Sequence, residues 1–111
     1  MLALFSSPLA LADDDDHDAI GKPIDCGNCA EWNKSLTPFK VVGNTWYVGT
    51  GGLSAVLLTG PQGHILFDGA LPQSAAQIKK NIATLGFKFG DVKYIVSSHP
   101  HWDHAGGIAE L

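Results

Sequence analysis

Four side chains that can bind a metal ion lie within six consecutive positions near the end of this 111-residue sequence. They are His99, His101, Asp103 and His104. Imidazole nitrogen and carboxylate oxygen are donors that suit zinc. The segment has no thiolate and is not dominated by oxygen donors, which argues against a structural thiolate site and against calcium or magnesium. The spacing therefore predicts a zinc site, and the alternative is a chance cluster of surface histidines at a turn.

The backbone around these residues is expected to place them on one side. An extended chain points His99 and His101 to the same side and carries Asp103 along in the same alternation, whereas adjacent His104 needs a turn to reach the ion. Gly106 and Gly107 allow a tight turn into a helix that should start near Ala105.

The elements before this loop predict an α/β unit. Residues 64–68 and 92–97 are typical of strands, and residues 72–85 carry apolar side chains at helical spacing. Gly86 suits the C-terminal cap of that helix, and Lys79, Lys80 and Asn81 should take its outer face. A strand, a crossover helix and a second strand place reactive loops at the C-terminal strand ends, and His99 comes two residues after Ser97.

The earlier sequence predicts more strands of the same sheet. Residues 39–42 and 45–48 are expected to form a hairpin through Gly43 and Asn44, followed by a flexible turn at 49–52. The nearly unbroken apolar run 53–59 indicates a strand that is buried on both faces.

Composition and charge narrow the class of protein. Hydrophobic residues make up 45% and charged residues 16% of the chain, which is typical of a globular protein. The net charge of -4 and the lack of a basic patch exclude nucleic acid as an expected partner. Cys26 and Cys29 form a single CxxC motif, without a second pair of cysteines. We expect either a local disulfide or two unlinked thiols, and no catalytic role.

The N-terminal residues indicate export. Residues 1–12 are apolar, too short to span a bilayer, and end in Ala10-Leu11-Ala12, the small-x-small pattern of a signal peptidase site, although no Lys or Arg precedes them. We therefore predict a signal peptide at 1–12 and a periplasmic mature protein. An acidic tail and irregular lead-in should occupy 13–38, with Trp32 packing the lead-in onto a domain at 39–111.

The segment HPHWDHAGG resembles the HxHxDH signature of the metallo-β-lactamase superfamily. The stretches GNTWYVGT, LSAVL, HILFDGA and LPQS are similar to class B β-lactamases of subclass B3, so that the resemblance covers roughly residues 25 to 111. It implies a four-layer αββα sandwich, of which this chain is the N-terminal half, and a site with two zinc ions.

By matching position, the resemblance implies that His99 and His101 bind the first zinc, and that Asp103 and His104 bind the second. Asp103 would also orient the nucleophile, and Asp68 would be a buried carboxylate that supports the loop, although an Asp before Gly69 is also ordinary in a turn. Trp102 would line the site or pack. Ser97 and Ser98 need no role, because the nucleophile is a metal-bound hydroxide.

The implied activity is zinc-dependent hydrolysis of small-molecule β-lactam antibiotics. The same signature fits a glyoxalase II-like thioesterase or a lactonase. A third hypothesis is a non-catalytic zinc-binding remnant. The resemblance implies that each zinc ion takes one further His from later loops, and the only other histidines in this sequence are His17 and His64. The chain is therefore expected to be a fragment, truncated after Leu111 and inactive by itself.

Overall fold

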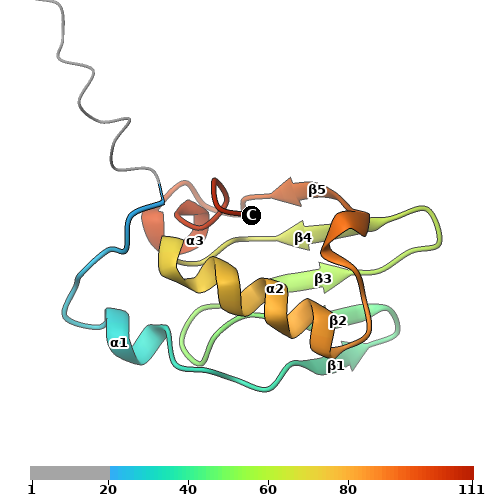
Figure 1. Ribbon diagram of the computed structural model, residues 1–111, viewed down its shortest axis with the longest axis horizontal. Coiled ribbons are helices and arrows are strands. Elements are labelled where there is room, and N and C mark those ends of the chain that lie inside the picture. The colour runs from blue at the N-terminus through green and yellow to red at the C-terminus, as the bar shows by residue number, and fades with distance from the viewer. Residues whose placement is uncertain (1–20) are drawn as a thin grey trace, which may run out of the picture.

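Within residues 21–111, five strands form one mixed sheet and lie side by side in the order in which they occur along the chain (Figure 1). The computed structural model describes residues 21–111, so the expected signal peptide at 1–12, the acidic run and His17 lie outside the described residues. The strands are β1 (Phe39–Val42), β2 (Thr45–Tyr47), β3 (Val56–Leu58), β4 (His64–Phe67) and β5 (Val92–Val96). Between residues 21 and 111, no helix has the length and hydropathy needed to cross a bilayer.

Short turns and one crossover connect these strands. The pairs β1–β2, β2–β3 and β3–β4 are antiparallel. The predicted hairpin is confirmed, with Gly43 at a φ of 55° in the turn between β1 and β2. β5 pairs with β4 in parallel, after a crossover through α2 (Ala75–Thr84). The predicted strand, helix and strand are therefore present, and the C-terminal ends of β4 and β5 lie next to each other.

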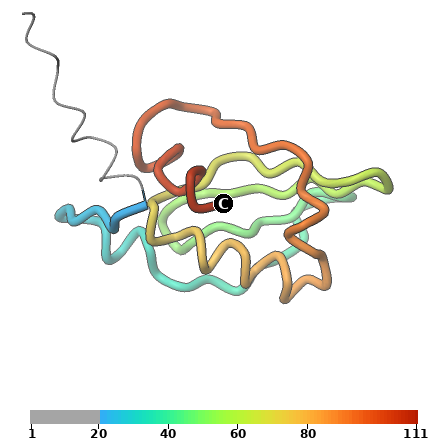
Figure 2. The backbone as a smooth tube through the Cα atoms, turned by 45° about the horizontal axis from the view of Figure 1, so that its top comes forward, coloured from blue at the N-terminus to red at the C-terminus, as the bar shows by residue number. Residues whose placement is uncertain are grey.

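The helix α2 lies across one face of the sheet and buries an apolar stripe there (Figures 1 and 2). Ile78 and Ile82 are fully buried, as are Leu57 of β3 and Leu66 of β4. Each such side chain stabilises the fold by about 1.5–3 kcal/mol through burial. A short 3-10 helix, η2 (Pro72–Ser74), begins this helical segment, and Gly86 ends it with a φ of 89°.

One residue of α2 contradicts its predicted position. Asn81 was expected on the outer face, but it is only 5% exposed. Its side-chain Nδ2 donates hydrogen bonds to the carbonyl oxygens of Val48 and Gly49, at 3.0 and 3.1 Å. The amide satisfies two backbone acceptors at the end of β2 that have no strand partner there, so a polar residue faces the core.

The opposite face of the sheet carries apolar side chains that no described segment covers. The prediction that 53–59 is buried on both faces is wrong, because Leu57 is fully buried whereas Val56 and Leu58 are only half-buried. The register places Phe67 of β4 between Val56 of β3 and Val96 of β5 on this face. The exposed apolar residues of this face, from β1 to β5, are Phe39, Val42, Phe67, Tyr94 and Val96.

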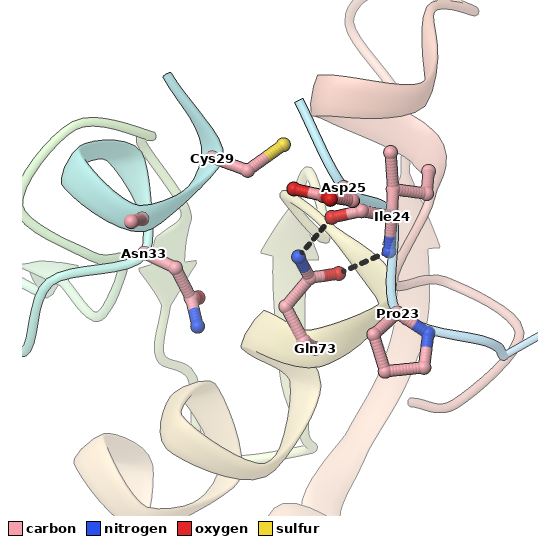
Figure 3. Close-up of a pocket in the computed structure, with 7 residues that line it drawn as sticks. Pro23, Ile24, Asp25, Cys29, Asn33 and Gln73 are labelled. Atoms are coloured by element: carbon pink, nitrogen blue, oxygen red, sulfur yellow. Dashed lines mark hydrogen bonds between the residues drawn. The ribbon is translucent and has the colours of Figure 1, made fainter. Parts of the chain in front are cut away.

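The lead-in segment is more ordered than predicted. It contains the short helix α1 (Cys29–Trp32), and Cys26 and Cys29 form a disulfide. The side-chain amide of Gln73 pairs with the backbone of Ile24, accepting from its N–H at 3.0 Å and donating to its carbonyl at 2.7 Å (Figure 3). Trp32 packs against the core as predicted.

Burial and backbone hydrogen bonds tie the turn at 49–52 to its neighbours. Thr50 is fully buried, and its backbone N–H donates to the carbonyl of Leu53 at 2.9 Å. The backbone N–H groups of Gly51 and Gly52 donate to the carbonyls of Lys34 and Trp32. A Cβ on Gly52 would lie 2.6 Å from the Cα of Trp32, so this glycine allows the close packing against the end of α1.

Candidate metal centre

The four predicted metal ligands lie at the C-terminal end of β5, beside the end of β4. Figures 1 and 2 show the segment after β5 at the same end of the sheet as α1 and the start of α2. Asp68 follows β4 directly, and its backbone N–H donates to the carbonyl of Val96 at 2.8 Å, which extends the pairing of the two strands. The parallel pairing therefore places Asp68 next to the loop that contains the histidines.

The carboxylate of Asp68 connects the two sides of this loop. Its Oδ1 accepts a hydrogen bond from the backbone N–H of Ser98 at 2.7 Å, and its Oδ2 accepts one from the Ser98 hydroxyl at 2.6 Å. The same Oδ2 lies 3.3 Å from Nδ1 of His104. Asp68 is only 8% exposed, so these contacts replace the hydrogen bonds that water would form with an exposed carboxylate.

These contacts decide the charge of Asp68. Burial alone raises the pKa of this carboxyl, but the hydrogen bonds from the Ser98 side chain and backbone, with the His104 ring, lower the pKa below its ordinary value of 3.8. The net shift keeps Asp68 ionised in the folded protein. A carboxylate here favours the His104 tautomer that carries its proton on Nδ1, which leaves Nε2 free to bind a ligand.

We expect the variant Asp68→Asn to be less stable than wild type by about 1–3 kcal/mol near pH 7, because the amide NH2 cannot accept a bond from Ser98. The folded-state pKa of Asp68 is lowered, so its contribution is present above the ordinary pKa and is lost as the pH falls through the lower folded-state value. The gap between variant and wild type should therefore narrow below a pH of 3.8. Chemical denaturation near neutral pH and at about pH 3 measures it, and a gap independent of pH would contradict this charge state.

The turn after β4 holds two residues in a left-handed conformation. Asp68 has a φ of 66° and Ala70 a φ of 53°. Asp tolerates this region, whereas Ala is uncommon there, so the surrounding contacts must hold the turn. The carbonyl of Ala70 accepts from the N–H of Gly107 at 3.0 Å, and the N–H of Gly69 donates to the carbonyl of His104 at 2.8 Å.

Close backbone contact explains the glycines of this region. A Cβ on Gly107 would lie 2.1 Å from the carbonyl oxygen of Gly69, and a Cβ on Gly69 would lie 2.9 Å from the backbone nitrogen of Ile108. The two segments pack backbone against backbone. The position of His104 is thereby fixed relative to Asp68.

The helix after the loop begins earlier than predicted. α3 spans Trp102–Ala105, with His101 as its N-terminal cap residue, so the predicted start near Ala105 is wrong. Asp103 does not continue an extended alternation, because it lies in this helical turn together with His104. The turn of α3 is what brings His104 back to the other rings.

The three histidine rings of the loop gather around His99. Its ring centroid lies 4.1 Å from that of His101 and 5.3 Å from that of His104, and both pairs meet edge to face. Oδ2 of Asp103 lies 3.6 Å from Nε2 of His104, the nitrogen that Asp68 leaves free. The donors form two neighbouring pairs, and within residues 21–111 no three His, Cys, Asp or Glu side chains are placed to hold one ion together.

Other titratable or sulfur side chains that the sequence raised lie elsewhere. His64 is buried at the start of β4, the opposite end of that strand from Asp68, and its Nδ1 accepts from the N–H of Gly60 at 3.2 Å. Cys26 and Cys29 are bonded to each other. A hollow of about 360 Å³ beside Cys29, Asn33 and Gln73 contains none of the five candidate site residues (Figure 3).

Ser97 and Ser98 are the residues that sequence reasoning missed. The prediction that they have no role fails in structural terms, because Ser98 provides two of the hydrogen bonds to Asp68 and the Ser97 hydroxyl donates to the carbonyl of His99 at 2.7 Å. No local pattern indicates the contact between Asp68 and Ser98, which are separated by 30 positions. Only the adjacency of Ser98 to the histidine motif could have drawn attention to it.

Known proteins are similar to this chain in sequence and in fold. The sequence model of the metallo-beta-lactamase superfamily matches residues 48–111. Rm3 metallo-beta-lactamase is 57% identical, over 78% of this chain and 32% of its own, with a TM-score of 0.75. MEM-A1, a subclass B3 metallo-beta-lactamase from a soil metagenome library, is 61% identical over 71% of this chain and 30% of its own, with a TM-score of 0.70. SMB-1, solved in a complex with mercaptoacetic acid, is 58% identical over 69% of this chain and 30% of its own, with a TM-score of 0.68.

The chain spans about a third of the length of these structures. Its mixed sheet, with α2 on one face, matches the N-terminal part of their fold, in agreement with the predicted α/β class. The family match covers more than half of the chain and includes the turn at Asp68 and the whole histidine loop. The chain belongs to the metallo-beta-lactamase superfamily.

Proposed function

We propose that the full-length protein that contains this chain is a zinc-dependent hydrolase of β-lactam antibiotics. The observation that carries the proposal is the gathering of three imidazoles and Asp103 at the C-terminal edge of the sheet, with Asp68 holding Nδ1 of His104. The similarity to subclass B3 enzymes supports the substrate class.

The donor types suit zinc, and the resemblance to the family supports their pairing. His99 and His101 would hold one ion, and Asp103 and His104 would hold a second. A histidine that binds zinc through one ring nitrogen usually donates a hydrogen bond to a carboxylate, a carbonyl or a water from the other. Asp68 is such a carboxylate at Nδ1 of His104. Zinc bound here would supply an acidified water and polarise the lactam carbonyl.

The residues of the chain would orient and retain the reacting groups. Asp103 is accessible, with a quarter of its side chain exposed, so its carboxylate can accept a hydrogen bond from the attacking water. Asp68 accepts hydrogen bonds from Ser98 and contacts Nδ1 of His104, so these two residues would orient the His104 ring. Trp102 is 43% exposed beside the loop, where its indole can contact an apolar substituent of the substrate.

Two other functions share this loop. A thioesterase or a lactonase would use the same donors on a different acyl group, and a non-catalytic remnant would bind zinc without turnover. The identity of 57% to Rm3 metallo-beta-lactamase and of 61% to the subclass B3 enzyme MEM-A1 favours the β-lactamase.

We expect the full-length protein to open nitrocefin and a carbapenem, and to lose this activity with EDTA and regain it with zinc. Clavulanate should have little effect because no serine ester forms, whereas mercaptoacetic acid should inhibit. Parallel assays with a thioester and a lactone distinguish the other hydrolases. Hydrolysis that resists the chelator, or zinc-loaded protein that opens no β-lactam, would contradict the proposed function.

We further propose export to the periplasm through residues 1–12. Cleavage after Ala12 should leave Asp13 as the first residue of the mature protein, because Ala10 and Ala12 fit the small-residue sites of signal peptidase. N-terminal sequencing of periplasmic material measures this. A product found only in the cytoplasm, still carrying Met1, would contradict it.

A further inference from the structure

The metal loop has an aromatic contact with the lead-in segment. Trp102 is the first residue of α3, between His101 and Asp103, and its ring centroid lies 6.0 Å from that of Trp32 at an interplanar angle of 40°. Aromatic rings at this separation attract each other. Trp32 is the last residue of α1, which Figures 1 and 2 show at the same end of the sheet as α3.

Trp32 is firmly held by the core. Its carbonyl accepts hydrogen bonds from the backbone N–H of Gly52 at 3.1 Å and from the hydroxyl of fully buried Thr50. A Cβ on Gly52 would lie 2.6 Å from the Cα of Trp32, so the two backbones are in direct contact. The ring itself packs against the buried core.

The disulfide provides a second anchor for α1. A helix of four residues is not stable by itself, so tertiary contacts must hold α1. Cys29 at its start is 4% exposed and is bonded to Cys26. The adjoining Asn33 accepts a hydrogen bond from Ser74 at the start of the α2 segment, at 2.6 Å. Trp32 is therefore a fixed surface against which another side chain can be positioned.

The helix α3 needs such a surface. It also has only four residues, and Trp102 leads it. Backbone hydrogen bonds fix the end of this segment, at His104 and Gly107, to the turn after β4. The side chain at its beginning is held by the contact with Trp32.

We propose that Trp32 is a positioning residue for the metal loop, which acts through Trp102 to hold the first turn of α3 and hence Asp103 and His104. The inference rests on the proposed zinc binding by these residues. It assigns the lead-in segment, which contains none of the proposed ligands, a part in metal affinity.

The test compares zinc affinity among variants of the full-length protein. Trp32→Ala should weaken zinc binding about tenfold, which is typical of the loss of a residue that positions a metal ligand without binding the metal itself. Trp32→Phe keeps an aromatic ring and should retain most of the affinity. The double variant Cys26→Ser, Cys29→Ser should weaken zinc binding in the same direction as Trp32→Ala. Competition with a chromophoric chelator measures each affinity, and near-ultraviolet circular dichroism reports the coupling of the two indoles.

Trp46→Ala is the matched control. Trp46 is also half-buried, but it packs against Phe87 beyond the far end of α2, with ring centroids 5.3 Å apart. This variant should lose stability and keep both zinc affinity and the indole signal. An equal loss of affinity in Trp46→Ala, or wild-type affinity in Trp32→Ala, would overturn the inference. A wild-type protein that binds zinc but opens no β-lactam would overturn the proposed function and leave the comparison of affinities valid, whereas a wild type without zinc affinity would overturn both.

Discussion

Replacing Asp103 with Asn in the full-length protein is expected to lower kcat for β-lactam opening by about 10²-fold or more and to change KM much less. Asp103 is the one carboxylate among the four proposed ligands, and it faces Nε2 of His104 at 3.6 Å. Asn keeps the shape of the side chain but loses the negative charge, which would hold a zinc ion and orient the attacking water through a charge-assisted hydrogen bond. Loss of one ligand should also lower zinc content.

Asp91→Asn is a suitable control for this variant. Asp91 is an exposed carboxylate in the short 3-10 helix η3 (Phe89–Asp91), which precedes β5 and lies at the opposite end of that strand from the loop. Its substitution should leave turnover and metal content at the wild-type level. Steady-state kinetics and metal analysis of both variants test the proposed role of Asp103. Near-normal turnover in Asp103→Asn would show that Asp103 neither binds a needed zinc ion nor orients the attacking water.

The elements that the sequence predicted well are those with a local pattern. The hairpin through Gly43, the amphipathic helix α2 and the strand before Ser97 each follow from periodicity and turn residues within a few positions of one another. The parallel pairing of β4 and β5 follows from the crossover between them. These features are sufficient to place the histidine loop at the C-terminal edge of a sheet.

The features that the sequence predicted poorly depend on distant contacts. Asn81 is buried because two carbonyls more than 30 positions away need donors. α3 begins at Trp102, and the contact with Trp32 that accompanies this start is also remote in sequence. Periodicity carries no information about such contacts. The sequence-based predictions therefore failed for the burial of a polar side chain and for the first residue of a short helix.

The candidate site divides in the same way. The donor types and their spacing were readable from HPHWDH, whereas the link from Asp68 to Ser98 and His104 required the fold. The resemblance to the family gave Asp68 its supporting role, and the residues alone favoured an ordinary turn. The positive φ of Asp68 agrees with the turn, and its contacts agree with the supporting role, so both interpretations describe part of the same residue.

A polypeptide of residues 13–111 expressed alone is expected to hydrolyse no nitrocefin, with or without zinc, and to aggregate. In the proposed assignment the loop would offer two donors to each zinc ion, whereas a catalytic zinc site generally has three protein ligands, so zinc binding should contribute little to folding. One face of the sheet is covered by α2, and the other exposes Val42 and Tyr94, each 69% exposed, among further apolar side chains. An uncovered apolar face of this kind favours association.

The substitutions Val42→Lys and Tyr94→Lys in the same polypeptide separate the two causes. They place charges on the open face at β1 and β5, which are also the two edges of the sheet, where lysine opposes strand addition. We expect this variant to be more soluble, because the apolar surface is interrupted, and to remain inactive, because the number of zinc donors is unchanged. Light scattering, amide exchange and nitrocefin turnover measure the three properties. A soluble monomer of the unsubstituted polypeptide, with protected amides and measurable turnover, would show that the loop needs no further ligand and the sheet no further cover.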